Sequence, residues 1–283
     1  MEIKPLTKID FDIIFKAFNQ AFADYEVQLN YEQLQAMLTR RGFNPALSFA
    51  AFENNEIVSF LFNGIGNFNG ILTAYDTGTG TLPDYRGQGL ATKIFDYSIP
   101  YLKDANIKQY LLEVLQHNTS AVSIYKNIGF ETIREFNYFS QNMNDINNKI
   151  KDATESYLIK EIDIEKYNFV LEFCDFHPSW QNSLESIKRA VGNFISLGAF
   201  VDEKLIGYCV FEPISGDITQ IAVDKQNRRK GVATLLLQEV IKLNKNDNIK
   251  IVNTDILCNS ITDFLQSKNI ALKGKQFEML KQL

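Results

Sequence analysis

The stretch TLPDYRGQGLATKIF, residues 81–95, ends an apolar strand, passes through a turn that contains glycine, and enters a helix. A similar stretch, IAVDKQNRRKGVATLL, occupies residues 221–236. Both contain an arginine, two residues, a glycine, one residue and an alanine. The two glycines, Gly89 and Gly231, lie 142 residues apart, which is about half of the 283-residue chain. An internal duplication is the simplest explanation.

The turn has the properties of an anion site. A helix N-terminus leaves backbone N–H groups unpaired and carries the positive end of the helix dipole, and glycine lets a phosphate approach the backbone closely. Thr92 and Thr234 would each add a hydroxyl. Positive charge could come from Arg86, Arg229 or Lys230. An ordinary helix start with a tightly packed glycine is the alternative, and the repetition of the turn after a strand favours phosphate binding.

The elements around the two turns follow the same order. In the first half the pattern predicts strands at residues 1–6, 47–52, 57–63, 71–82, 109–115, 130–133 and 136–141, and helices at residues 11–23, 31–40, 89–103 and 119–126. In the second half it predicts strands at residues 157–162, 194–201, 205–211, 217–223, 249–257 and around 277, and helices at residues 165–173, 183–191, 231–243 and 261–267. We therefore expect a mixed α/β (α+β) fold.

The segment of residues 142–156 separates the two patterns. It is polar, rich in lysine and asparagine, and without apolar periodicity, so it is predicted to be a linker. The expected domains are residues 1–141 and 157–283. Residues 77–80, Thr-Gly-Thr-Gly, interrupt a strand and predict a β-bulge or a close approach by another group.

Composition excludes several classes of function. The net charge is −5 and the basic residues are scattered, which argues against nucleic acid as a partner. No apolar run approaches the roughly 20 residues that cross a bilayer, and the first residues lack a secretory or transit pattern, so a cytoplasmic location is expected. Three separated cysteines and two histidines predict neither a metal site nor a disulfide framework.

The sequence matches neither of two other nucleotide-binding motifs. Gly64-Ile65-Gly66 followed by Gly70 imitates a dinucleotide fingerprint, but no helix follows it, and we interpret these residues as glycines of a hairpin turn. The phosphate-loop pattern GxxxxGK[ST] is absent.

The order of elements, together with RGQGLA at residues 86–91, resembles the GNAT superfamily of N-acetyltransferases. The resemblance covers nearly the whole chain as two tandem copies. It implies two domains, each a twisted mixed sheet flanked by helices, and acetyl-CoA as co-substrate without a metal. The implied reaction is acetyl transfer to a primary amine by direct attack, with no covalent enzyme intermediate.

The resemblance also assigns residues. In the first copy the cofactor would be held by Leu82, Arg86, Gly87, Gln88, Gly89, Leu90, Ala91, Thr92 and Asn118, and in the second by Gly231 and Ala233. Backbone groups of Leu82 would polarise the acetyl carbonyl. Tyr125 matches the general acid, because a phenol with a pKa near ~10 holds a proton at neutral pH that it can give to the departing thiolate.

The base and the acceptor site are less defined. Asp76 and Glu113 are candidates for the base; each could equally be a solvated or structural carboxylate, and water could relay the proton instead. In the family the segment between the first two helices covers the acceptor. Here that segment contains Asp24, Tyr25 and Glu26, whose acidity suits a cationic amine.

The second copy departs from the family pattern. Phe264 or Leu265 stands where the tyrosine should be, and Asn269 and Ile270 replace Gly129 and Phe130. We expect the first domain to be catalytic and the second to be degenerate. The alternatives are a non-catalytic acyl-CoA-binding or scaffold protein, and an enzyme that acetylates a protein or peptide rather than a small amine. The expected protein is a monomer or homodimer.

Overall fold

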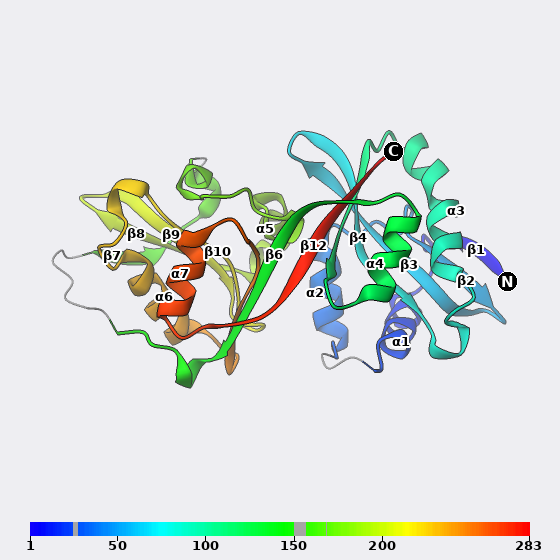
Figure 1. Ribbon diagram of the computed structural model, residues 1–283, viewed down its shortest axis with the longest axis horizontal. Coiled ribbons are helices and arrows are strands. Elements are labelled where there is room, and N and C mark those ends of the chain that lie inside the picture. Colours follow the sequence, from blue (N-terminus) through cyan, green and yellow to red (C-terminus); the bar gives the residue numbers. More distant parts are fainter. Residues whose placement is uncertain (25–27, 150–156, 168) are drawn as a thin grey trace. The chain divides into compact units, whose positions relative to one another are not determined.

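The computed structural model describes residues 1–24, 28–149, 157–167 and 169–283 (Figure 1). The chain divides into two compact units that are both mixed α/β. The first unit contains Met1–Arg134, Leu184–Ala190 and Phe277–Leu283, and the second contains Glu135–Ser183 and Val191–Gln276. The last residues of the chain, Phe277–Leu283, therefore belong to the first unit. Residues from Glu135 onward, which the sequence pattern places at the end of the first half, belong to the second unit.

The first unit is built on a sheet in the order β1-β2-β3-β4-β5-β12. The strands are β1 (Glu2–Pro5), β2 (Phe49–Glu53), β3 (Glu56–Phe68), β4 (Ile71–Thr81), β5 (Gln109–Leu115) and the end of β12 (Ala271–Gln282). Pairing is antiparallel from β1 to β4 and parallel between β4 and β5. The helices are α1 (Phe11–Ala21), α2 (Tyr31–Arg41), α3 (Leu90–Asp104), α4 (Thr119–Asn127) and α5 (Leu184–Arg189).

Alternation along the strands gives this sheet two buried faces. In β2, Ala50 and Phe52 pack in a core with residues of α1 and α2, whereas Phe49 and Ala51 pack in a core with residues of α3 and α4. Met279 of β12 completes the second of these cores. Helices therefore cover both faces of the first sheet.

A β-bulge in β4 shapes the middle of this sheet, as the Thr-Gly-Thr-Gly stretch predicts. The register with β3 shifts so that Thr77 is the extra residue. Beyond the bulge, Gly80 lies so close to its neighbours that an added Cβ would stand 2.5 Å from a Phe60 ring carbon and 3.0 Å from the Cβ of Ala21. β4 is paired with β5 over Thr73–Tyr75, so the bulged part of β4 lies beyond the paired stretch.

The second unit repeats this plan with the strand order β6-β11-β10-β9-β8-β7. Its strands are β6 (Glu131–Asn142), which begins in the first unit, β7 (Leu158–Glu161), β8 (Ile195–Val201), β9 (Lys204–Glu212), β10 (Asp217–Val223) and β11 (Asn248–Asp255); its helices are α6 (Val232–Leu243) and α7 (Asn259–Ser267). β10 also carries a bulge, at Thr219, and pairs with β11 in parallel at Asp217. The two bulges, Thr77 and Thr219, are as far apart in sequence as the two glycine turns.

Three sequence predictions were wrong in detail. The strands predicted at residues 130–133 and 136–141 form one strand, β6, which begins at Glu131, because Arg134 in the middle is neutralised by Glu278. The helix predicted at residues 165–173 is replaced by 3-10 turns at Ile164–Lys166 and Val170–Phe173, where aromatic and β-branched residues favour a helix weakly.

The third concerns the glycines at residues 64–66. Gly64 and Gly66 lie inside β3 rather than in a turn, and a Cβ on Gly64 would stand 2.0 Å from the carbonyl oxygen of Arg41. Gly70, with φ +79°, does lie in the turn between β3 and β4. Close packing, rather than turn geometry, therefore explains the glycine at position 64.

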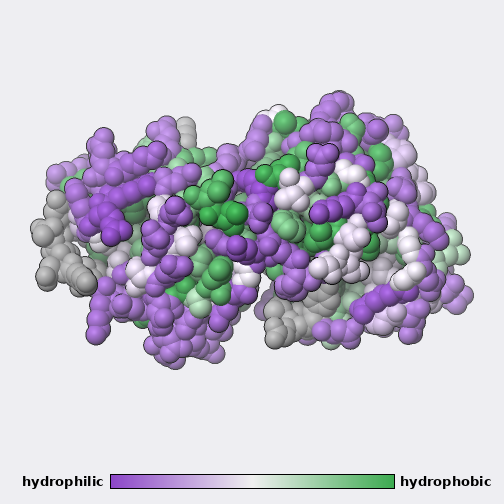
Figure 2. All heavy atoms as spheres, viewed as in Figure 1, coloured by the Kyte–Doolittle hydropathy of each residue, from purple (hydrophilic) through white to green (hydrophobic). Residues whose placement is uncertain are grey.

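Part of the predicted linker is structured. Residues Met143–Asp145 form a 3-10 turn, Ile146 is buried in the core of the second unit, and the N–H of Asn147 donates to the carbonyl of Lys268 over 2.9 Å. Residues 150–156 lie outside the described residues. The face drawn in Figure 2 is mostly hydrophilic, with small hydrophobic areas between the polar side chains. No helix in the described part of the chain is long and apolar enough to cross a membrane.

Candidate functional site

The turn before α3 presents open backbone. Gly89 is the N-cap of α3 in the left-handed conformation, φ +71°, and the N–H of Lys93 donates to its carbonyl over 3.1 Å. Helix geometry leaves the N–H groups before Lys93 without intrahelical partners. A Cβ added to Gly87 or Gly89 would meet no atom within 4 Å. The turn therefore has both donors and room for an anionic group.

The side chain of Arg86 is held by protein groups. Its guanidinium donates from Nε to the Thr81 carbonyl (3.3 Å), from one terminal nitrogen to the Asp24 carboxylate (2.9 Å), and from the other to the Ala21 carbonyl (2.9 Å). Its backbone N–H donates to the carbonyl of Pro83 over 3.2 Å. The sequence suggested that Arg86 supplies charge to a phosphate; in the structure its side chain ties the end of β4 to the end of α1.

The backbone of Leu82 is likewise engaged. Its N–H donates to the carbonyl of Val58 in β3 over 2.9 Å, and its carbonyl accepts from the N–H of Tyr85 over 2.9 Å. In an antiparallel pair, consecutive residues direct their N–H groups to opposite sides. The N–H of Thr81 therefore faces away from β3, toward the edge of β4 that lies beyond its pairing with β5. This placement gives Thr81, rather than Leu82, the backbone donor on that edge.

Asp76 and Tyr125 form a hydrogen-bonded pair. The Tyr125 hydroxyl donates to Asp76 Oδ2 over 3.0 Å. The Thr79 hydroxyl donates to the same oxygen over 2.8 Å, and the N–H of Gly78 donates to Oδ1 over 2.9 Å. Asp76 is only 8% exposed, and this burial raises its pKa from 3.8 to about 6 although the three hydrogen bonds oppose the shift. The carboxyl group can therefore take up and release a proton near neutral pH.

Local packing holds the tyrosine of this pair. Tyr125 lies on α4 and packs edge-to-face on Phe95 of α3 and on Phe130, each with a ring separation of 5.9 Å. Asn118 caps the same helix, because its side chain accepts from the N–H of Ala121 over 3.2 Å. The structure thus gives Asn118 a role in starting α4, which is compatible with the cofactor contact that the family resemblance implies.

Glu113, the other candidate base, lies on β5 and is partly buried. It interacts with the hydroxyl of Tyr75, whose pKa is raised well above its usual value by burial and by Glu113, while Arg41 opposes the shift. Arg41 also donates to the carbonyl of Thr77, the bulged residue, over 2.9 Å. Sequence reasoning assigned no role to the Thr79 side chain, although Thr79 lies in the Thr-Gly-Thr-Gly stretch, and it missed Arg41, which stands in no recognisable motif.

Of the three acceptor-site residues predicted from the sequence, the structure describes only Asp24. Asp24 is exposed and paired with Arg86, and Tyr25 and Glu26 lie outside the described residues. Among residues that the structure describes, there is no group of three or more histidine, cysteine, aspartate or glutamate side chains that could hold a metal ion.

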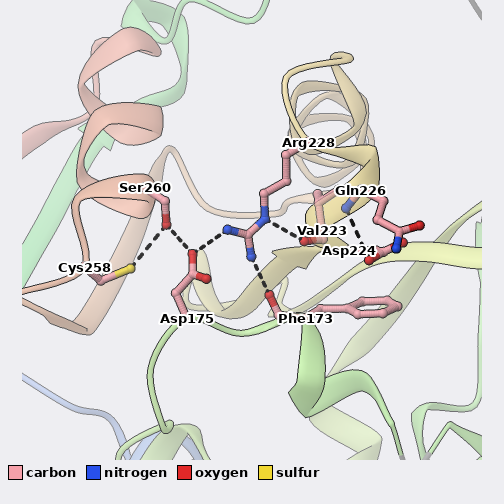
Figure 3. Close-up of polar contacts among 8 residues, drawn as sticks. All are labelled: Phe173, Asp175, Val223, Asp224, Gln226, Arg228, Cys258 and Ser260. Carbon is pink, nitrogen blue, oxygen red and sulfur yellow. Dashed lines mark hydrogen bonds and ion pairs between the residues drawn. The ribbon is translucent and has the colours of Figure 1, made fainter.

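The second unit repeats the arginine contacts at the other turn (Figure 3). Arg228 donates from Nε to the Val223 carbonyl (3.0 Å), and from its terminal nitrogens to the Asp175 carboxylate (2.7 Å) and the Phe173 carbonyl (2.9 Å). The Ser260 hydroxyl donates to the same carboxylate over 2.5 Å. We call these two sets, Arg86 with Asp24, Ala21 and Thr81, and Arg228 with Asp175, Phe173 and Val223, the arginine clamps.

The catalytic candidates are not repeated. The bulges align Asp76 with Ile218, the residue before each bulge. Helices α4 and α7 have 9 residues each, which aligns Tyr125 with Leu265 and decides between the two residues that the sequence left open. Ile218 and Leu265 are 2% and 1% exposed and belong to the core of the second unit. Apolar side chains therefore stand at the positions where the first unit has the hydrogen-bonded pair of Asp76 and Tyr125.

A cavity of about 790 Å³ opens beside the second turn. Its lining includes Arg228, Gly231, Ala233 and Thr234 of the turn and helix α6, together with Gln220 of β10 and Phe264 of α7. Gly231 is left-handed, φ +90°, like Gly89, and Arg229 takes the left-handed position that Gly87 occupies in the first unit. The second turn has kept the shape of the first.

Comparison with known proteins agrees with this architecture. The structure of a GCN5-related N-acetyltransferase from Sphaerobacter thermophilus is similar over 99% of this chain and 95% of its own, with a TM-score of 0.70 and 14% identity. A tandem GNAT protein from the clavulanic acid biosynthesis pathway is similar over 99% and 98%, with a TM-score of 0.73 and 13% identity. At these identities the likeness shows the fold.

Sequence comparison gives the family. N-alpha-acetyltransferase 30 of Schizosaccharomyces pombe is 30% identical over 87 residues, a match that covers 30% of this chain and 58% of that protein. The chain thus spans less than two thirds of that relative. The model of the acetyltransferase (GNAT) family matches residues 11–130 and 157–259, more than half of the chain and once in each half. The chain belongs to the GNAT acetyltransferase family, in a tandem form.

Proposed function

We propose that the protein is an acyltransferase that moves an acetyl group from acetyl-CoA to a primary amine by direct attack, and that the first unit performs the chemistry. The observation that carries the proposal is the hydrogen bond between Tyr125 and Asp76, which lies next to the bulge of β4, the strand that leads into the turn at Gly89. The apolar residues at the equivalent positions of the second unit support a single catalytic centre.

The turn would hold the diphosphate of acetyl-CoA. Backbone N–H groups from Gly87 to Thr92, including those of Gln88, Leu90 and Ala91, would point to it at the positive end of α3. The open space at Gly87 and Gly89 supports this fit. In the second unit Gly231 and Ala233 would offer the same donors, and a cavity of about 790 Å³ is within the usual size of a ligand site.

Backbone and side chain would share the chemistry. The N–H of Thr81, next to Leu82, would stabilise the negative charge that develops on the thioester oxygen when the amine attacks. Asp76, ionised above its pKa of about 6, would accept the proton that the amine loses. Tyr125 would give its proton to the departing thiolate and regain one from Asp76 through their hydrogen bond. The amine proton is thereby transferred, in two steps, to the thiol.

Glu113 is an alternative base, because it lies on β5, the strand parallel to β4. Replacement of each carboxylate by its amide separates the two assignments. Asp76→Asn should abolish most turnover, whereas Glu113→Gln should leave more than half of it. A larger loss with Glu113→Gln than with Asp76→Asn would transfer the role of base to Glu113.

The acceptor belongs to one of two classes. A small amine is the first, and the likeness to N-alpha-acetyltransferase 30 of Schizosaccharomyces pombe supports a peptide N-terminus as the second. A screen that measures thiol release from acetyl-CoA with polyamines, amino acids, aminoglycosides and short peptides distinguishes them. Peptides accepted only with a free N-terminus would favour the second class.

Tyr125→Phe tests the proposal with the accepted amine in hand. We expect turnover to fall by about 10²-fold or more, the range of general acid catalysis, while calorimetry shows nearly unchanged acetyl-CoA affinity. Unchanged turnover would remove the role of Tyr125. Acetyl-CoA binding without turnover for any amine would leave a non-catalytic acyl-CoA-binding protein, and no binding would leave a scaffold.

A further inference from the structure

The two arginine clamps are alike in ways that the rest of the two sites is not. In each clamp, Nε donates to the carbonyl of the strand residue five positions earlier. One terminal nitrogen donates to the carbonyl of the last residue of a helical segment, Ala21 of α1 or Phe173 of the 3-10 turn Val170–Phe173. The other donates to an aspartate two or three residues after that carbonyl. The pair of Asp76 and Tyr125 has no polar counterpart in the second unit. The clamp is therefore a feature of the turn and is independent of proton transfer.

We propose that Arg86 is a positioning residue for the phosphate turn rather than a phosphate ligand. The guanidinium lies on the strand side of the turn and connects Thr81, where β4 ends, with Ala21, where α1 ends. Between Thr81 and Gly89 the chain has one short 3-10 turn, Pro83–Tyr85, so the clamp fixes the start of a segment whose far end carries the N–H donors. The inference rests on the proposed function, because it concerns the site of the acetyl-CoA diphosphate.

The charges around Arg86 allow two roles to be separated. Asp24 accepts one arm of the guanidinium and contributes a negative charge near the turn. If Arg86 contacted phosphate directly, its charge would matter most, Lys would substitute for it, and removal of the Asp24 charge would strengthen binding. If Arg86 positions the turn, the forked geometry matters, and Lys cannot reproduce three simultaneous contacts on two backbone carbonyls and a carboxylate.

The experiment measures the affinity of coenzyme A for the full chain by calorimetry at a temperature where every variant is folded. We expect Arg86→Ala to weaken coenzyme A binding by about tenfold. The affinity of Arg86→Lys should differ from that of Arg86→Ala by no more than about twofold. Asp24→Asn should weaken binding by about two- to fivefold. The double variant should bind no more weakly than Arg86→Ala, because both changes break one clamp.

Two further variants serve as controls. Lys16→Ala removes one positive charge from α1 and thereby breaks the exposed ion pair with Glu56. It should leave the affinity for coenzyme A unchanged. Arg228→Ala makes the same change in the second unit and identifies which binding event belongs to which turn.

Two outcomes would overturn the inference. One is wild-type affinity in Arg86→Lys together with equal or tighter binding in Asp24→Asn, which would make Arg86 a direct phosphate ligand. The other is unchanged affinity in all clamp variants with a lowered melting temperature, which would make the clamp purely structural. Coenzyme A binding with the expected pattern but no acetyl transfer to any amine would support the clamp and defeat only the proposed function.

Discussion

The two glycine turns of this chain, at Gly89 and Gly231, share their backbone conformation and differ in the side chains of their units. Both follow a bulged strand, both begin a helix after a left-handed glycine, and both are held by an arginine clamp. The unit of the first turn contains the polar pair of Asp76 and Tyr125, and the unit of the second has Ile218 and Leu265 at the equivalent positions. The comparison teaches that the fold of the turn does not require the pair of Asp76 and Tyr125, which belongs to the unit where we place the reaction.

The largest expected effect separates the two units by activity. Asp76→Asn should lower turnover by about 10²- to 10³-fold, because the carboxylate would no longer accept a proton. Ile218→Val, at the equivalent position of the second unit, should change turnover less than twofold while it costs about 1 kcal/mol of stability. Thiol release with the accepted amine measures both. Similar losses of activity in the two variants would contradict the assignment of chemistry to the first unit.

A smaller effect concerns the strand that the first unit takes from the end of the chain. Glu278, 1% exposed, accepts two hydrogen bonds from Arg134, at 2.6 and 2.8 Å. Glu278→Ala would remove the buried carboxylate that pairs with Arg134, and should lower the free energy of unfolding by about 3 kcal/mol. Denaturation by urea measures it.

The control for this prediction lies in the second unit. Lys242→Ala breaks an exposed ion pair with Glu239 on α6 and should change the free energy of unfolding by less than about 0.5 kcal/mol. A loss below 1 kcal/mol in Glu278→Ala would mean that the last residues of the chain contribute little to the first unit.

Local patterns in the sequence predicted the individual elements well and the pairing between distant elements poorly. Strands β5 and β10 have the predicted bounds, and the repeated turn indicated the duplication and the family. These features depend on local periodicity and on short motifs. Which unit receives the ends of β6 and β12 depends on contacts between residues far apart in sequence, such as Arg134 and Glu278, and local patterns do not encode it.

The candidate site shows the same limit. Asp76 and Tyr125 were each predicted, but their contact depends on the bulge at Thr77, which sets the face on which Asp76 lies. Arg86 stood in a motif that suggested a phosphate ligand, and sequence cannot say whether a guanidinium meets a ligand or its own backbone. Motifs locate such residues, and tertiary contacts decide what they do.

A pH-dependent effect tests how much the burial of the Asp76 carboxyl group lowers the free energy of unfolding. Its pKa is raised from 3.8 to about 6 by burial, so the ionised form destabilises the fold, and stability that is fully present below pH 3.8 is lost as the pH rises through about 6. Asp76→Asn removes this loss. The difference in unfolding free energy between variant and wild type should therefore shift in favour of the variant by up to about 3 kcal/mol from pH 4 to pH 8.

The same pKa predicts the acid side of the activity profile. Turnover per enzyme should fall about tenfold for each pH unit below about 6, because Asp76 must be ionised to act as the base. A profile that stays flat down to pH 4.5 would exclude Asp76 from that role.

The smallest effect compares the clamps. Arg228 and Asp175 are each 27% exposed, against 44% and 65% for Arg86 and Asp24, and Asp175 has the additional donor Ser260. Coupling energies from double-mutant cycles in thermal unfolding should therefore be larger in the second unit, about 1 kcal/mol against a few tenths. Equal coupling energies in the two units would show that the burial of the ion pair does not determine the strength of the clamp.

The most direct test of the central claim is the turnover number of wild type, Tyr125→Phe, Asp76→Asn and the double variant with one accepted amine. Because the two side chains pass one proton between them, the double variant should be no slower than the slower single variant. Losses that multiply, or wild-type turnover in either single variant, would contradict a single proton-transferring pair in the first unit.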